Sequence, residues 1–311
     1  MKRVIKKLLS NTASLVGIVL LIFFIVIALL APIIAPPLSD DPYQVPRMSW
    51  NVNPQPPGTP MSDNIREIYE QMGKKVKLTK ALLGTEQGGY DIFYGLVWGT
   101  RTAFKVGIIT VGVAMIIGIF VGSVAAYFGG WLDEVLMRFT DVFLSFPFLV
   151  AAMVLTTILG KGLDKVIIAL IVFGWMGYAR VIRGSILAVR EDVYVMAAKA
   201  LGVKDGRIIL RHLLPNTIFP VLVQASMDTG SMVVTASALS FLGVGAPEGY
   251  ADWGQMASFA RNWIVGSPGH AFQYWYTVFF PALFIALFVL AWNLIGDTLR
   301  DILDPRLRGE L

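Results

Sequence analysis

The sequence predicts an all-α protein that crosses a membrane six times. Three observations lead to this fold class. Six apolar runs are each long enough to span a bilayer, which takes about 20 residues. Only 15% of the 311 residues are charged and the mean hydropathy is +0.66, whereas soluble domains carry about 25% charged residues. The net charge of +5 at pH 7 suits a membrane protein, because Lys and Arg retain loops on the cytoplasmic side.

The first apolar run, residues 14–35, is predicted to be an uncleaved anchor. It is longer than the apolar region of a signal peptide, which has about 7–15 residues. Pro36 and Pro37 follow it in place of a small-residue cleavage site. Because Lys and Arg are frequent before residue 8, the N-terminus is expected in the cytoplasm. Residues 1–35 therefore form the N-terminus and the first span.

Five further runs are predicted to build a packed core at residues 101–299. Gly118 and Gly122 have the spacing that lets two helices approach closely in lipid. Pro147 interrupts the second of these runs and Pro281 lies within the last. The predicted spans are residues 104–127, 135–159, 166–189, 217–242 and 276–299.

Six spans and a cytoplasmic N-terminus determine on which side of the membrane each loop lies. Residues 190–216 and the tail 300–311 fall in the cytoplasm, and both are basic as the positive-inside rule expects. Residues 36–100 fall outside, where long segments translocate regardless of their charge. This external segment is rich in proline at first and then has a helical pattern over residues 61–83.

Several kinds of chemistry are absent from the sequence. It has no phosphate-binding P-loop, no zinc-protease or serine-hydrolase motif and no cysteine. His212 and His270 are far apart, so they form no metal site by themselves. We therefore expect no catalytic residue, no metal and no cofactor. The basic composition is explained by the membrane and does not require nucleic acid.

Charges inside the apolar runs are candidates for a transport pathway. Asp141 is expected near the headgroups, capped or paired with Arg138. Asp228 lies deeper, and it either faces a water-filled pathway or bonds Ser and Thr on a neighbouring helix. Arg180 and Arg183 are expected to extend to the inner headgroups.

The loop at residues 190–216, which the resemblance described below leads us to call the coupling loop, is predicted to hold two short helices. Good helix formers continue to Leu201, and Gly202 can then adopt a left-handed C-cap. A second helix follows, with Ile208, Ile209 and Leu213 on one face, and Pro215 ends it. Such a pair either lies on anionic lipid or docks a cytoplasmic partner.

The coupling loop resembles the EAA loop of binding-protein-dependent ABC transporter permeases. Ala197, Ala198, Gly202, Leu214 and Pro215 match its pattern, whereas Met196 replaces the Glu and His212 the Ile. Four other stretches resemble the dipeptide/oligopeptide/nickel (DppC/OppC-type) subfamily: residues 84–101, 138–150, 239–256 and 292–308. The likeness covers the first span and the chain from about residue 83, while residues 43–81 resemble an insertion.

The resemblance implies a type I importer permease fold in the cytoplasmic membrane of a prokaryote. The chain would pair with a second, homologous permease, two cytoplasmic ATP-binding subunits and an extracytoplasmic substrate-binding protein. ATP hydrolysis would occur on the partner subunits, so the chain itself would not be an enzyme. Di- or oligopeptides are the expected cargo, and oligosaccharides and nickel chelates are the alternatives. The residues expected to couple to the ATPase are Ala197, Ala198, Gly202, Arg207, Arg211, Leu214 and Pro215.

The external segments are expected to contact the binding protein. Residues 36–100 and 241–275 contain many aromatic residues, which are frequent at interfaces but also at membrane boundaries. The candidate contacts are Glu248, Trp253 and Asn262. Two rival functions explain less. A membrane enzyme would need a convergent set of catalytic groups, and a passive channel leaves the coupling loop unexplained.

Overall fold

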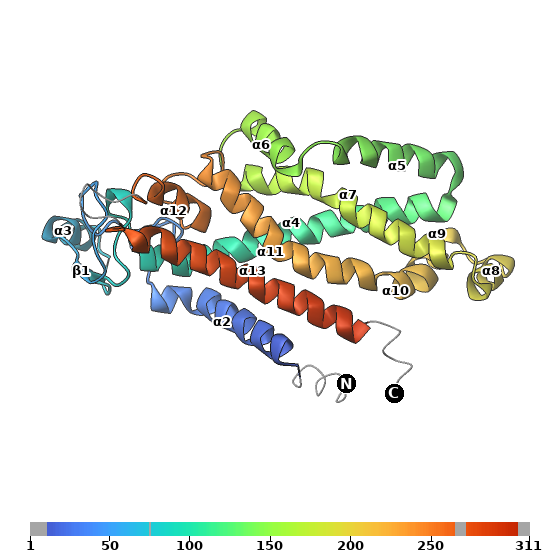
Figure 1. The fold of residues 1–311 in the computed structure, drawn as a ribbon, viewed down its shortest axis with the longest axis horizontal. Coiled ribbons are helices and arrows are strands. Elements are labelled where there is room, and N and C mark those ends of the chain that lie inside the picture. Colours follow the sequence, from blue (N-terminus) through green and yellow to red (C-terminus); the bar gives the residue numbers. More distant parts are fainter. Residues whose placement is uncertain (1–10, 75, 265–271, 304–311) are drawn as a thin grey trace.

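The structure, a computed structural model, describes residues 11–74, 76–264 and 272–303. Four helices in this part of the chain are long and apolar enough to cross a membrane: α2 (Thr12–Ile34), α4 (Ile92–Phe128), α7 (Leu163–Val189) and α13 (Trp275–Leu303). They run roughly along the long axis of the molecule (Figure 1). The all-α membrane fold predicted from the sequence is therefore confirmed.

Two bent helix pairs bring the number of spans to six if each pair is one span. The first joins α5 (Gly130–Leu144) and α6 (Phe148–Leu159) at an angle of 86°. Pro147 lies at this break and caps α6, as its interruption of the apolar run predicts. The second joins the end of the coupling loop to α11 (Phe219–Phe241) at 63°.

Helix α4 begins twelve residues before the predicted span. The Asp91 side chain accepts a hydrogen bond from Phe93 N at 3.0 Å and caps the helix at Ile92. The apolar pattern alone placed the start at Phe104, because the first three turns of α4 carry Gly, Thr and Arg101. At its other end α4 stops at Gly129, whose φ of +64° favours glycine.

The main core lies between α4, α7 and α11. Gly118 and Gly122 face α7 so closely that a Cβ on either would overlap the carbonyl oxygen of Trp175 or Ala179. This confirms the close packing expected from their spacing. Fully buried side chains such as Ala114, Leu170 and Tyr178 fill the interface.

The two ends of the bundle carry different structures (Figure 1). One end is a cap, defined here as residues 36–74, 76–91 and 242–264. It holds a two-stranded antiparallel sheet of β1 (Thr59–Pro60) and β2 (Lys80–Ala81), α3 (Asp63–Gln71), the 3-10 turn η1 (Gln87–Gly89) and α12 (Trp253–Ala260). The helix predicted over residues 61–83 is thus confined to Asp63–Gln71, and Gly73 with φ +72° follows its end.

The opposite end is formed by the coupling loop. It contains α8 (Val193–Ala200), α9 (Asp205–Ile208), the π-helical turn η2 (Ile209–Leu213) and α10 (Leu214–Thr217). Because cap and coupling loop lie at opposite ends, the alternation of sides predicted from the sequence fits this arrangement.

Candidate functional site

The coupling loop folds as two short helical segments joined at Gly202. Gly202 has φ +73°, the left-handed conformation that its C-cap position predicts. The N–H of Gly202 donates to Lys199 O at 3.0 Å, and the N–H of Val203 donates to Ala198 O at 3.1 Å. These bonds satisfy carbonyls at the end of α8 and turn the chain into α9.

The inner face of the coupling loop is anchored to the bundle. Val195, Ile208 and Leu213 are fully buried and belong to the main core. The Tyr127 hydroxyl, at the end of α4, donates to the Asp205 carboxylate at 2.6 Å. Lys199 lies over the Tyr127 ring at 4.8 Å. The loop is therefore held rigidly by α4 and the core.

The outer face exposes both apolar and basic side chains. Val193 is 78% exposed, Leu201 83% and Leu210 69%. Among the residues predicted to couple, Ala197, Gly202, Arg207, Arg211 and Pro215 are exposed. Exposed apolar groups of this size at one end of a protein are typical of an interaction surface.

Two of the predicted coupling residues lie elsewhere. Ala198 is 7% exposed and packs in the core, so it does not face outward beside Ala197 as predicted. The reason is the 3.6-residue period of α8, which turns Ala198 to the same side as Val195. Leu214 is half-buried and packs against the same core.

Pro215 does not end the second helix. It occupies the first turn of α10, where the missing N–H of proline costs little, and the helix continues to Thr217. The preceding turn is π-helical, and Asn216 Nδ2 donates to His212 O at 2.8 Å. The break comes later, between Thr217 and Phe219, where the chain bends by 63° into α11.

Ion pairs connect α5 to α7. Arg183 donates from Nε and Nη2 to the two carboxylate oxygens of Asp133, both at 2.6 Å. Arg180 Nη2 donates to Asp141 at 2.5 Å, whereas Arg138 lies 3.6 Å from Glu134. The predicted Asp141–Arg138 pair is therefore wrong, because Arg138 lies beside the acid one helical turn before it. Arg180 and Arg183 each bind an acid on α5, and their expected position near the inner headgroups stays a prediction.

Asp228 on α11 faces α7. Its carboxylate lies beside the Tyr178 hydroxyl and the Gln224 amide. The Tyr178 hydroxyl has no hydrogen bond of standard geometry among the described residues. The neighbours of Asp228 are thus a phenol and an amide, and the predicted Ser and Thr partners are not among them.

The cap holds the three residues predicted to contact a binding protein. Glu248 and Asn262 are exposed. Trp253 is only 2% exposed and packs with Phe24, Phe284 and Phe288, and its indole N–H donates to Leu96 O at 3.2 Å. Trp253 therefore lies inside the protein and not on the predicted contact surface, because α12 folds back against α4 and α13.

Sequence reasoning missed three buried carboxyl groups in the cap. Burial, and then the charge of Asp91, raises the pKa of Glu86 to about 8. Burial raises the pKa of Asp91 to about 7 and also raises the pKa of Asp252. Asp91 and Asp252 are the N-caps of α4 and α12, and an acidic residue directly before a helical run could have predicted both caps. Glu86 Oε1, in contrast, has no hydrogen-bond partner among the described residues.

No group of three or more His, Cys, Asp and Glu side chains among the described residues is arranged to hold a metal ion. Two surfaces that the geometry offers for function are the outer face of the coupling loop and the surface of the cap.

Comparison with known proteins matches two family models. Residues 114–309 match the binding-protein-dependent transport system inner membrane component, and residues 1–57 match the N-terminal transmembrane domain of oligopeptide transport permease C. The chain is 34% identical to a dipeptide transport system permease protein, DppC, of Alkalihalophilus pseudofirmus, over 98% of this chain and 89% of that protein. It is 39% identical to a glutathione transport system permease protein, GsiD, of Pectobacterium atrosepticum, over 73% of each.

The fold is also similar to a solved structure. The inward-facing MetNI methionine ABC transporter superposes with a TM-score of 0.55 at 19% identity. The match covers 68% of this chain and 98% of that one. At this identity the likeness concerns the fold alone.

Proposed function

This chain belongs to the family of inner-membrane components of binding-protein-dependent transport systems, and we propose that it is one permease subunit of a peptide importer. Members of this class are permeases and not themselves enzymes. In the proposal, the chain forms half of a pathway with a second, homologous permease. Two cytoplasmic ATP-binding subunits drive the pair, and a substrate-binding protein delivers the cargo from outside.

The outer face of the coupling loop supports the link to an ATPase. It presents Val193, Met196 and Leu201 to solvent while Val195 and Ile208 fix its inner face to the bundle. A rigid mount with an exposed apolar surface transmits movement of a bound partner to the spans. ATP binding to that partner shifts the equilibrium between the inward- and outward-facing states of the permease. The size of the shift is set by the difference in the partner's affinity for the two states.

The cargo class rests on the relatives. The two similar permeases are named for dipeptide and glutathione transport, and this favours peptides over oligosaccharides or nickel chelates. Because the external binding protein makes most of the choice of substrate, the test is calorimetry of the cognate binding protein with a dipeptide, an oligosaccharide and a nickel chelate. Binding of either of the last two without the peptide would assign a different cargo.

The coupling assignment is tested by cysteine cross-linking, because the chain has no native cysteine. Met196→Cys in the assembled transporter should cross-link to a cysteine in the groove of the ATP-binding subunit. Arg66→Cys, exposed on α3 in the cap, is the matched control and should not. If Met196→Cys reacts only with a lipid-soluble thiol reagent and never with the ATPase, the loop lies on the membrane and the coupling assignment fails.

A further inference from the structure

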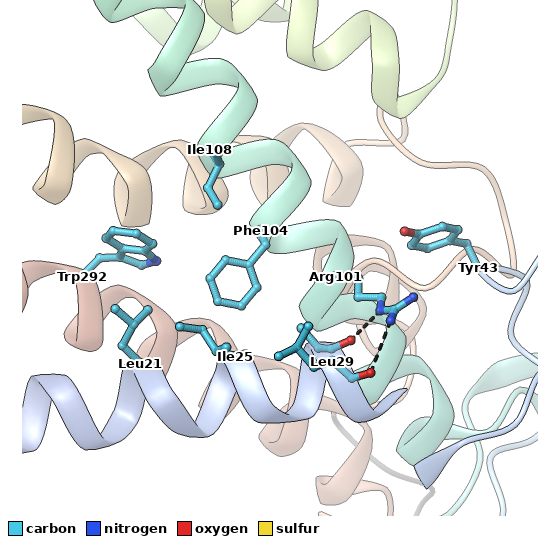
Figure 2. A pocket seen from close by; sticks show the side chains of 9 residues that line it. Leu21, Ile25, Leu29, Tyr43, Arg101, Phe104, Ile108 and Trp292 are labelled. Atoms are coloured by element: carbon cyan, nitrogen blue, oxygen red, sulfur yellow. Dashed lines mark hydrogen bonds between the residues drawn. The ribbon is translucent and has the colours of Figure 1, made fainter. Parts of the chain in front are cut away.

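We propose that a groove between α2, α4 and α13 binds one anionic phospholipid, with its phosphate at Arg101 and one acyl chain along α2. The groove has a volume of about 560 Å³, within the range of about 300–1,000 Å³ for small-molecule sites. Figure 2 shows Arg101 and Tyr43 toward one end, Trp292 at the other and Phe104 between them. It is lined by Leu21, Ile25, Ala28, Leu29, Tyr43, Arg101, Phe104, Ile108 and Trp292.

The walls of the groove suit a hydrocarbon chain. Ile25 on α2 is 39% exposed and Ile108 on α4 is 54% exposed, although both lie in helices that qualify as membrane spans. Covering such side chains with an acyl chain restores the contacts that an empty groove lacks. The walls alone would accept any apolar partner, so the choice of ligand depends on the charge at the end of the groove.

Arg101 brings an uncompensated positive charge to the groove. Its Nε donates to Ala28 O at 2.5 Å and its Nη2 contacts Leu29 O at 3.5 Å (Figure 2). Ala28 O is free to accept because Pro32, four residues later, has no N–H. Carbonyl oxygens satisfy donors but carry no net charge, and no carboxylate pairs with Arg101 in the part of the chain that the structure describes.

The neighbouring cation shows the contrast. Lys105, one turn further along α4, pairs with Asp164 at 2.9 Å. Arg101 instead lies over the Trp98 ring at 4.9 Å and keeps part of its guanidinium open to the groove. A planar guanidinium with free donors is suited to bind phosphate oxygens in a bidentate way.

The position of Arg101 along the spans matches the level of the lipid headgroups. Ala28 and Leu29 lie in the last two turns of α2, whose apolar run ends at Ile34. Helix α4, with 37 residues, is about 55 Å long and exceeds the hydrocarbon core of about 30 Å, so part of it projects beyond the membrane. Its apolar run begins at Phe104, which assigns the projecting part to the first turns, on the side of the cap. Arg101 therefore lies near the level where hydrocarbon meets headgroups, on the side of the cap.

Charge complementarity selects an anionic phospholipid. In phosphatidylethanolamine the ammonium group of the lipid compensates its own phosphate, whereas phosphatidylglycerol retains a net negative charge. A single cation near an anionic surface contributes about 1 kcal/mol, which corresponds to about fivefold in preference. An apolar helix of a partner protein would leave the charge of Arg101 unpaired.

The test places a photo-cross-linker in the groove of the assembled transporter. Ile108→p-benzoylphenylalanine is reconstituted in vesicles of phosphatidylglycerol and phosphatidylethanolamine in equal amounts, and the adducts are identified by mass spectrometry. Phe120→p-benzoylphenylalanine, at a 70% exposed position on the same helix, reports the composition of the surrounding lipid. The expected result at Ile108 is a ratio of phosphatidylglycerol to phosphatidylethanolamine adducts of about five to one, against one to one in the vesicles.

A second substitution separates charge from structure. Adding Arg101→Gln should return the adducts at Ile108 to the vesicle composition, whereas Arg101→Lys should retain the preference. Adducts with peptides of a second permease would show that a protein covers the groove. Lipid adducts at the vesicle composition, or no adduct at Ile108, would equally overturn the proposal.

Discussion

The coupling loop and the cap differ in whether they expose or bury charged and large apolar side chains. The coupling loop exposes Arg207 and Arg211 together with large apolar side chains such as Leu201. The cap encloses its carboxyls Glu86, Asp91 and Asp252 and the indole of Trp253. Exposed apolar groups stabilise a protein only when another surface covers them. Buried carboxyls make the stability of the segment that contains them depend on their protonation. The loop is therefore suited to bind a partner, and the cap to pack against its own spans.

The largest expected effect tests whether the cap is packed from within. Trp253→Ala removes a fully buried indole from the Phe24, Phe284 and Phe288 cluster, which should cost about 3–5 kcal/mol of stability. Trp131→Ala, at a position 75% exposed on α5, is the matched surface control and should change stability by less than about 0.5 kcal/mol. Thermal unfolding of the purified transporter measures both. If both variants lowered the unfolding temperature equally, the tryptophan in the cap would contribute no more to stability than one at the surface.

A smaller but more selective effect is expected in the coupling loop. Gly202→Val forces a β-branched residue into φ +73°, which costs about 1–2 kcal/mol, and the altered turn should lower binding-protein-stimulated ATP hydrolysis. A Cβ at Gly202 would meet no atom within 4 Å, so strain and not collision is the cause.

Gly206→Val provides the control for this loop. Gly206 lies four residues later in α9, is also free of neighbours around a Cβ and has no positive φ. It should retain most of the stimulated hydrolysis, and both variants should insert and assemble normally. If the two valines have the same effect, or if neither has any, the coupling role of the left-handed turn is wrong.

The sequence predicts the bundle better than it predicts either end. Apolar runs and the Gly118–Gly122 spacing indicate the spans, because a spanning helix needs about 20 mostly apolar residues and small residues let such helices approach closely. At the ends, local signals have more than one meaning. Pro215 marks either the end or the first turn of a helix, and the structure uses the second. Trp253 marks an interface, a membrane boundary or a core, and only the return of α12 against α13 decides among them.

Charged residues show the same limit. Asp141 has Arg138 near it in sequence, but its partner Arg180 comes from another helix. Gly202 is the opposite case, because a left-handed turn depends only on neighbouring residues and could be predicted. What depends on local backbone preference or on the membrane is visible in the sequence, and what depends on contacts between distant segments is not.

The last prediction concerns pH and the buried carboxyls of the cap. Because burial raises the pKa of Glu86 from 4.5 to about 8, the folded cap holds a proton that the unfolded chain releases. The folded state is then favoured most below about pH 4.5, and its stability falls as the pH rises through about 8. Burial of Asp91, with a pKa raised to about 7, acts in the same direction.

Glu86→Gln should weaken this dependence, because an amide of the same shape carries no charge at any pH. The transition temperature of the wild-type transporter should fall from about pH 6 to about pH 9, and that of the variant should fall less. Glu248→Gln, at an exposed position in the same cap, should leave the wild-type slope unchanged. A steeper slope in Glu86→Gln, or the same slope in all three proteins, would mean that the cap does not bury a protonated Glu86. The contrast between the two ends would then rest on the buried Asp91, Asp252 and Trp253.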